Sequence, residues 1–193
     1  ILAFLLTNYS YASGIGLMHG KMGGVLFFFL YARYTRNDIY EEYAEMLMED
    51  IYNNINEEIP IDFETGLCGI GWGIEYLLQN KLVNGNSDEI LMNIDRKIME
   101  RAPLRIYDYS MENGLGGILL YVNARIKSYK REMPFDLRYL TELKTKIDTL
   151  ITTDRLFHQN INDFKKMMAG QIDYNTPATL PDFLFGIIPE QID

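Results

Sequence analysis

This chain has few of the residues that bind metal ions or form disulfides. Its 193 residues include one cysteine, Cys68, and two histidines, His19 and His158. A single cysteine excludes a disulfide within the chain and fits a reducing compartment, so we predict a cytoplasmic location. Zinc sites usually contain two cysteine or histidine ligands that lie close together in the sequence. No such pair is present, so we predict no metal site and no cofactor.

Positive charge is also scarce. The chain has 18 lysine and arginine residues against 27 aspartate and glutamate residues, which gives a formal net charge of −9. Nucleic acids and anionic membrane surfaces bind clusters of lysine and arginine, so we expect neither as a partner. A cationic peptide or a neutral substrate is compatible with the acidic composition.

Long apolar runs are missing as well. A membrane-spanning helix needs a run of about 18 apolar residues. The longest candidate, from Val25 to Ala32, is shorter and is followed by Arg33. The apolar residues 1–6 lack the basic region that begins a signal peptide. We therefore expect no contact with a membrane.

What the sequence has instead is a glycine-rich turn that occurs three times. The three turns contain the pairs Gly16-Leu17, Gly66-Leu67 and Gly114-Leu115, which are separated by 50 and 48 residues. A period near 50 residues is typical of a repeat architecture. Each turn precedes an apolar helix, and each apolar helix precedes an amphipathic one. The turns therefore mark where several helices begin at the same end of an array.

The helix pattern predicts the fold class. Apolar helices are expected at 22–34, around 74–78 and at 118–126, and amphipathic helices at 38–55, 86–98 and 140–151, with a further helix from 154 to 168. Asp38 with Glu41 resembles a capping box, and Asn86 with Glu89 can cap the second amphipathic helix. No segment of adequate length shows the alternation of a β-strand. Residues 180–187 resemble the entry to a fourth unit.

These elements form an α/α array with the apolar helices inside and the amphipathic helices outside. We predict one all-α domain over residues 1–193. Its architecture is an incomplete, toroid-like array of helix hairpins, with about three and a half repeats.

The turns resemble those of the lanthionine synthetase C-like family. The likeness rests on four segments, residues 16–23, 66–73, 110–117 and 182–186, which read GLMHGKMG, GLCGIGWG, SMENGLGG and DFLFG. The resemblance implies an α/α toroid of about seven helix pairs. It also implies enzymes that cyclise peptides, in which a zinc ion activates a cysteine thiol that adds to a dehydrated serine or threonine and forms a thioether.

The chain departs from the family pattern at the metal site. The family's zinc is held by one cysteine and an adjacent Cys-His pair from later repeats, whereas this chain has only Cys68, in an early repeat. We therefore expect a protein associated with peptide modification that binds or scaffolds peptides and is not an active zinc cyclase as it stands. Whether it has enzymatic activity stays open. A scattered zinc site of Cys68, His19 and Glu64 or Glu112 is a weaker alternative to a buried, inert Cys68.

Five residues are candidates for the functional site. His19 is the candidate catalytic residue, because imidazole titrates near neutral pH. The candidate substrate-binding residues are Trp72, Glu75, Glu112 and Asp182. Three of the five have a structural interpretation as well. His19 can form a hydrogen bond to a neighbouring turn, and Trp72 can be a core residue. Glu75 can be the partner of an arginine, for which Arg33 and Arg125 on the other inner helices are available.

The ligand is expected at the glycine-turn end of the array. Helix N-termini converge there and can hold a carboxylate or another anion. A peptide or a small molecule is the expected ligand, and self-association through the open edges of the array is a further expectation. Two other functions remain open: a protein-interaction module, and a carbohydrate-active toroid that uses two carboxylates from Glu64, Glu75, Glu112 and Asp182.

Overall fold

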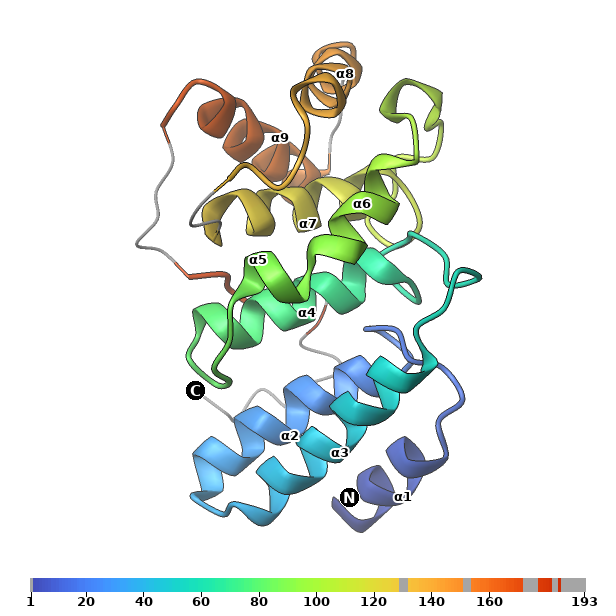
Figure 1. The fold of residues 1–193 in the computed structure, drawn as a ribbon, viewed down its shortest axis with the longest axis vertical. Coiled ribbons are helices and arrows are strands. Elements are labelled where there is room, and N and C mark those ends of the chain that lie inside the picture. The colour runs from blue at the N-terminus through green and yellow to red at the C-terminus, as the bar shows by residue number, and fades with distance from the viewer. Residues whose placement is uncertain (1, 129–131, 151–153, 172–176, 182–183, 185–193) are drawn as a thin grey trace.

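The protein is described here by a computed structural model that covers residues 2–128, 132–150, 154–171, 177–181 and 184 (Figure 1). Over these residues the chain forms nine α-helices and one 3-10 helix and no β-strand, which confirms the prediction of an all-α fold. The α-helices are α1 (Leu2–Tyr11), α2 (Lys21–Thr35), α3 (Ile39–Asn54), α4 (Leu67–Gln79), α5 (Ser87–Ile90), α6 (Met92–Met99), α7 (Leu115–Ser128), α8 (Leu137–Asp148) and α9 (Arg155–Met168), and the 3-10 helix is η1 (Pro103–Arg105).

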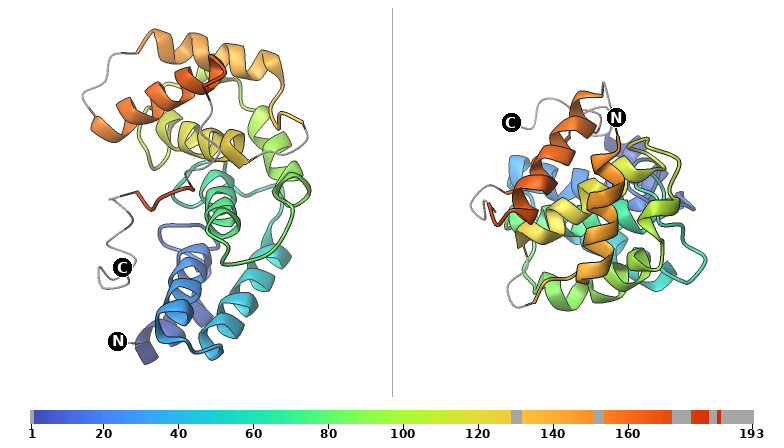
Figure 2. Two further views of the ribbon diagram at one scale, coloured as in Figure 1. Left: turned by 90° about the vertical axis from the view of Figure 1, so that its left-hand side faces the viewer. Right: turned by 90° about the horizontal axis from the view of Figure 1, so that it is seen from above.

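The helices are stacked in groups along the long axis of the molecule. The α2–α3 pair lies near one end, α4 lies in the middle with α5 and α6, and α7 lies towards the other end with α8 and α9 (Figures 1 and 2). Helices α2, α4, α7 and α9 contact one another in that order. The array is open, because α1 and α8 lie at opposite ends of the long axis.

The inner and outer helices differ as the sequence predicts. Helix α2 buries residues on all sides, among them Phe27, Phe28 and Phe29. Helix α3 buries only one stripe, which includes Leu47 and Ile51, and exposes its glutamates to solvent. An inner helix is thus surrounded by other helices, and an outer helix buries one face and exposes the other to solvent.

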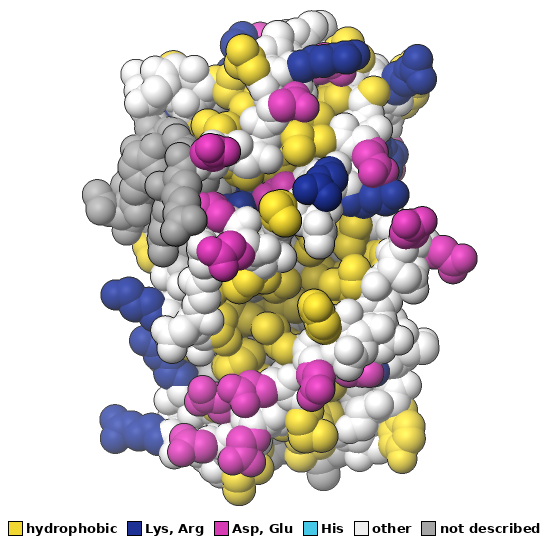
Figure 3. All heavy atoms as spheres, in the orientation of Figure 1, with side chains coloured by type: hydrophobic (Ala, Val, Ile, Leu, Met, Phe, Trp, Pro, Cys, Tyr) yellow, Lys and Arg dark blue, Asp and Glu magenta, His cyan; other side chains and the backbone are white. Residues whose placement is uncertain are grey.

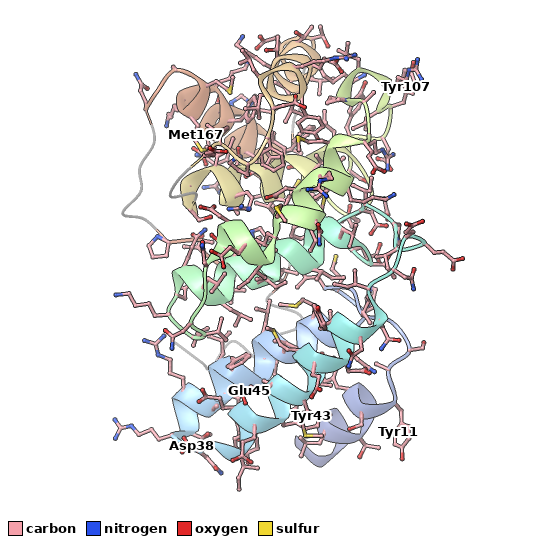
Figure 4. All side chains as sticks on the ribbon, in the orientation of Figure 1. Tyr11, Asp38, Tyr43, Glu45, Tyr107 and Met167 are labelled. Atoms are coloured by element: carbon pink, nitrogen blue, oxygen red, sulfur yellow. The ribbon has the colours of Figure 1, made fainter. Side chains whose placement is uncertain are left out.

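Helix α1 covers the outer side of this first pair. Tyr43 of α3, labelled in Figure 4, donates its hydroxyl to the carbonyl oxygen of Leu6 at 2.7 Å. The Ser10 hydroxyl lies 2.8 Å from the same tyrosine oxygen. The contact joins the amino-terminal helix to the first outer helix.

Two helix starts differ from the sequence prediction. The Asp38 side chain makes no capping hydrogen bond, because its backbone is already helical, and the Asn37 side chain accepts from the Ile39 N–H at 3.2 Å instead. The second outer helix is divided at Leu91 into α5 and α6, although backbone hydrogen bonds continue through the division. Asn86 does cap α5 by accepting from the Asp88 N–H at 3.2 Å.

The three glycine turns have equivalent structures, but the glycines that correspond to one another differ from those that the sequence predicts. Helices α2, α4 and α7 begin directly after Gly20, Gly66 and Gly114, so the counterpart of Gly66 in the first turn is Gly20 and not Gly16. The first residue of each helix donates its backbone N–H to the carbonyl seven residues earlier, Lys21 to Gly14, Leu67 to Pro60 and Leu115 to Asp108, at 2.9, 2.8 and 2.9 Å. The Gly-Leu pair does not mark equivalent positions in the three turns, because α2 begins with a lysine where α4 and α7 begin with a leucine.

Main-chain hydrogen bonds also join each turn to the next. Met18 donates its N–H to the Glu64 carbonyl at 2.9 Å, and Glu64 donates its own to the Glu112 carbonyl at 2.9 Å. Each of these residues lies two positions before the glycine that starts a helix. These three joined turns, here called the strip of turns, pack so closely that glycine is required. A Cβ on Gly66 would lie 2.2 Å from the Pro60 carbonyl oxygen. The φ angle of Gly66, −112°, is open to any residue, so the requirement is steric.

One face of the molecule exposes apolar side chains. On the face shown in Figure 3 they gather in a hollow between α3 and α5, with acidic side chains along the α3 edge. Ile90 of α5 is among the large apolar residues that remain exposed. Self-association through the open edges of the array stays a prediction.

Candidate functional site

His19 lies at the surface of the first glycine turn. Its Nε2 lies 3.2 Å from Oε1 of Glu64 in the second turn, and the side chains of the two residues are 73% and 25% exposed. The other carboxylate oxygen of Glu64 accepts from Asn113 of the third turn at 3.4 Å. This surface chain of polar contacts therefore crosses all three turns. A catalytic role for His19 stays a prediction.

We expect the His19→Ala substitution to change the free energy of unfolding by less than about 0.5 kcal/mol, because exposed ion pairs contribute little stability. Urea unfolding of the substituted and unchanged chains measures the difference. A loss of more than about 1.5 kcal/mol would contradict the view that this contact is a solvated surface pair.

Glu112 lies beside a cavity at the glycine-turn end. The cavity has a volume of about 370 Å³ and is lined by residues of the third turn and by the start of α9, among them Tyr109, Met111, Asp154 and Phe157. This is the end of the array at which a ligand was predicted. Asp182, the remaining acidic candidate, lies outside the described residues.

Glu75 is part of a buried ion cluster that joins α4, α5, α6 and α7. Arg125 of α7 places its Nη1 3.2 Å from Glu75 and its Nε 3.0 Å from Asp95, and its Nη2 lies 3.3 Å from Asp88. The side chains of Arg125 and Glu75 are 1% and 0% exposed. The structure thus selects Arg125 from the two arginines considered, whereas Arg33 donates to the Asn80 carbonyl at 3.3 Å.

Hydroxyl groups complete the cluster. Ser128 donates to Glu75 at 2.6 Å, and Tyr121 donates to Asp95 at 2.6 Å. Burial raises the pKa of both Glu75 and Asp95, and Arg125 opposes that rise. Three carboxylates surround one guanidinium group, so the cluster carries excess negative charge. The Glu75 carboxylate is occupied by this network and joins neighbouring repeat units.

Trp72 is almost fully buried, and it still borders a cavity. Its ring stacks on Tyr76 at a centroid distance of 5.5 Å and meets Phe63 edge-on at 5.8 Å. The cavity of about 180 Å³ lies between α4, α7 and α9, and its lining includes Trp72, Leu120, Asn123 and Asn160. Pro177, Ala178, Thr179 and Pro181 close its remaining side. Trp72 is therefore a core residue and also forms part of the wall of a cavity.

Residues 177–181, here called the docked segment, are held on α4 by side-chain amides. The Ala178 N–H donates to Oε1 of Gln79 at 2.8 Å, and Nδ2 of Asn80 donates to the Ala178 carbonyl at 3.0 Å. Figure 2 (left) shows the segment on the side of α4 away from α5 and α6. Gln79 also donates to the Ala124 carbonyl of α7 at 3.1 Å, which fixes the orientation of its amide.

Gln79 and Asn80 were not among the predicted site residues. They follow the apolar part of α4 and resemble an ordinary polar helix end. Their contacts with Ala178 join positions 98 and 99 residues apart. Local periodicity carries no signal for such a pairing, because it depends on how α4, α7 and α9 pack together.

One known protein family matches most of the chain. The model of the lanthionine synthetase C-like protein family matches residues 12–175, which is most of the sequence. The chain belongs to this family. The match includes all three glycine turns and α2 to α9. No curated protein and no solved structure matches the chain.

The described residues of this lanthionine synthetase C-like chain do not fit the zinc ion of the family's cyclising enzymes. Within that part of the chain, no group of three or more His, Cys, Asp or Glu side chains is arranged to hold a metal. Cys68 is fully buried, and burial together with the charge of Asp62 raises its thiol pKa well above the usual value. Zinc binds the thiolate, so this environment opposes ligation.

Among the described residues of the lanthionine synthetase C-like chain, no helix combines the length and the apolar character that crossing a membrane requires.

Proposed function

We propose that this lanthionine synthetase C-like chain binds peptides on the surface formed by α4, α7 and α9. In this proposal it takes part in peptide modification as a binding or scaffolding component, and the residues described here do not act as a zinc cyclase. The observation that carries the proposal is the docked segment, a stretch without regular secondary structure that Gln79 and Asn80 hold through the main chain of Ala178.

The chemistry of these contacts suits peptide recognition. A side-chain amide offers both a donor and an acceptor, so two of them can satisfy the N–H and the C=O of one residue whatever its side chain is. The prolines at 177 and 181 favour an extended backbone on either side of Ala178. A peptide in the same conformation would meet the same two amides. The cavity beside Trp72 would accept a neighbouring group of that peptide.

Family membership does not favour the carbohydrate-active alternative. That function needs two carboxylates that face a substrate across a cleft. The Glu75 carboxylate is instead buried against Arg125 and Ser128. The cavity beside Glu112 stays a predicted second contact for the ligand, and the cytoplasmic location stays a prediction.

A peptide added in trans tests the proposal. The probe is a fluorescent synthetic peptide with the sequence of residues 175–184, and the protein is the full chain with the substitution Ala178→Pro, which removes the N–H that Gln79 accepts. We expect the peptide to bind this variant about tenfold more tightly than the unchanged chain, because the tethered segment competes at an effective concentration on the order of millimolar. Fluorescence anisotropy measures the dissociation constants.

The control is a second peptide in which proline replaces the alanine that corresponds to Ala178. It lacks the same N–H, so we expect it to bind at least about tenfold more weakly to the variant. Circular dichroism verifies that Ala178→Pro keeps its helix content. The proposal fails if neither peptide binds the variant, or if both bind it equally well.

A further inference from the structure

The hollow between α3 and α5 lies on a face of the molecule that the proposed peptide site does not use. Helix α3 packs on α2, α5 packs on α4, and the two groups are joined through the contact between α2 and α4. The two outer helices leave apolar side chains uncovered between them, as Figure 3 shows. The docked segment lies on the other side of α4 (Figure 2, left), so the hollow and the peptide site are separate surfaces.

One side of α3 combines apolar and acidic residues. Tyr43 points towards α1, because its hydroxyl bonds to the Leu6 carbonyl. Residues two positions apart lie on nearly opposite sides of a helix, so Glu45, labelled in Figure 4, points away from α1. The residues that share the side of Glu45 recur at spacings of three and four along the chain: Glu41, Glu45, Met48, Tyr52 and Ile55. Met48 and Ile55 pack partly against the core, whereas Tyr52 is 79% exposed, so this side of α3 offers both apolar surface and carboxylates.

The helices on both sides of the hollow carry negative charge. The acidic residues of α3 are Glu41, Glu42, Glu45, Glu49 and Asp50, and this helix contains no lysine or arginine. Helix α5 contains Asp88 and Glu89 next to Ile90, which is 48% exposed. The lysine and arginine side chains that Figure 3 shows lie around the hollow and not within it. Apolar surface with an acidic edge is complementary to a partner that carries lysine or arginine beside an apolar stripe.

The walls of the hollow favour a helical partner over an extended one. In a helix the main-chain N–H and C=O groups are bonded to one another, so α3 and α5 offer no row of main-chain groups to an extended peptide. A helical partner satisfies its own main chain and presents apolar side chains at spacings of three and four residues. A second copy of this chain is a poor occupant, because it would bring the same acidic edge and a net charge of −9 to the contact.

We propose that the hollow between α3 and α5 is the docking site for a basic amphipathic helix of a partner protein. The apolar stripe of that helix packs on Met48 and Ile90. Its lysine and arginine side chains lie beside Glu41 and Glu45 on one edge and Glu89 on the other. The inference is independent of the proposed function, because a different face of the molecule carries it.

A set of three fluorescent helical peptides tests the proposal on the full chain. The first contains leucine, alanine and lysine, with the leucines along one side and the lysines along the other. We expect it to bind saturably in the micromolar range, and more weakly as the salt concentration rises, because its charges pair with exposed carboxylates. The second has glutamate in place of every lysine, and the third has the composition of the first in scrambled order. Each is expected to bind at least about tenfold more weakly in fluorescence anisotropy.

The two comparison peptides separate the contributions of charge and shape. Equal binding of the first and the scrambled peptide would overturn the proposal, because attraction to an acidic protein would then explain the binding without a groove. Equal binding of the lysine and glutamate peptides would overturn the role of the acidic edge. Absence of saturable binding of the lysine peptide would overturn the docking site itself.

Charge reversal on the protein locates the site. We expect Glu41→Lys with Glu45→Lys to weaken binding of the lysine peptide about tenfold and to strengthen binding of the glutamate peptide. The matched control is Glu142→Lys with Asp148→Lys, which makes the same change in net charge on α8, at the other end of the molecule, and is expected to change binding less than about twofold. Circular dichroism verifies the helix content of both variants. Equal effects of the two reversals would overturn the proposal, and so would a dimer in sedimentation velocity that Ile90→Asp abolishes, which would assign the hollow to a second copy.

Discussion

Substitution of Arg125 by alanine is expected to lower the free energy of unfolding by about 3–5 kcal/mol at neutral pH. The guanidinium group contacts three carboxylates, and Glu75 and Asp95 have almost no exposure to water. Removal of the cation leaves two buried negative charges with only hydroxyl and amide partners. Urea unfolding followed by circular dichroism measures the loss.

The loss is expected to depend on pH in a defined direction. Burial raises the pKa values of Glu75 and Asp95 in the folded protein. A carboxyl group with a raised folded pKa stabilises the fold most when it is protonated, below its unfolded value of about 4, and this contribution is lost as pH rises through the folded pKa. Without Arg125, which lowers both pKa values, they rise further. The deficit of the variant should therefore be largest near pH 7 and shrink towards pH 4.5.

Arg33 provides the matched control. It lies on the first inner helix, in a place comparable to that of Arg125, and it is exposed and donates one hydrogen bond to a carbonyl. We expect Arg33→Ala to cost less than about 1 kcal/mol at every pH. An equal deficit for Arg125→Ala at pH 7 and pH 4.5 would show that the charge of the carboxylates is not the source of the loss.

The sequence allowed prediction of the properties that depend on local pattern. The apolar inner helices, the one-sided outer helices and the Asn86 cap follow from residue spacing alone. The Asp38 cap does not form because the backbone of Asp38 is already helical, and the Asn37 side chain accepts from the Ile39 N–H instead. Residue spacing alone does not rank two adjacent capping residues. The resemblance to the family rests on the serial order of the turns, and the family model matches residues 12–175, which include all three.

The properties that depend on packing between repeats could not be predicted. A carboxylate within an apolar helix indicates a cationic partner, yet the sequence offered two arginines and only the arrangement of α4 and α7 selects Arg125. The docked segment and its amide contacts involve residues almost 100 positions apart. Such pairings are properties of the assembled array.

Gly69→Ala is expected to lower the free energy of unfolding by about 3 kcal/mol, although alanine is favoured over glycine within a helix by about 1 kcal/mol. Gly69 lies in the first turn of α4. A Cβ at this position would lie 2.0 Å from the Phe63 carbonyl oxygen and 2.9 Å from Cβ of Leu17. The peptide that carries the Phe63 carbonyl cannot easily move away, because its N–H, which belongs to Glu64, is bonded to the Glu112 carbonyl at 2.9 Å.

Substitutions at Gly14 and Gly117 test whether the loss at Gly69 comes from close packing between adjacent glycine turns. A Cβ on Gly14 would meet its nearest atoms at 3.7 and 3.8 Å, so Gly14→Ala should change the free energy of unfolding by less than about 0.5 kcal/mol. Gly117 is the counterpart of Gly69 in the register set by Gly66 and Gly114, and its Cβ would lie 2.4 Å from the Met111 carbonyl oxygen and from Cβ of Phe63. Gly117→Ala should therefore be as costly as Gly69→Ala. A stabilising effect of either substitution in chemical unfolding would contradict the close approach of adjacent turns, because helix propensity would then be the dominant effect.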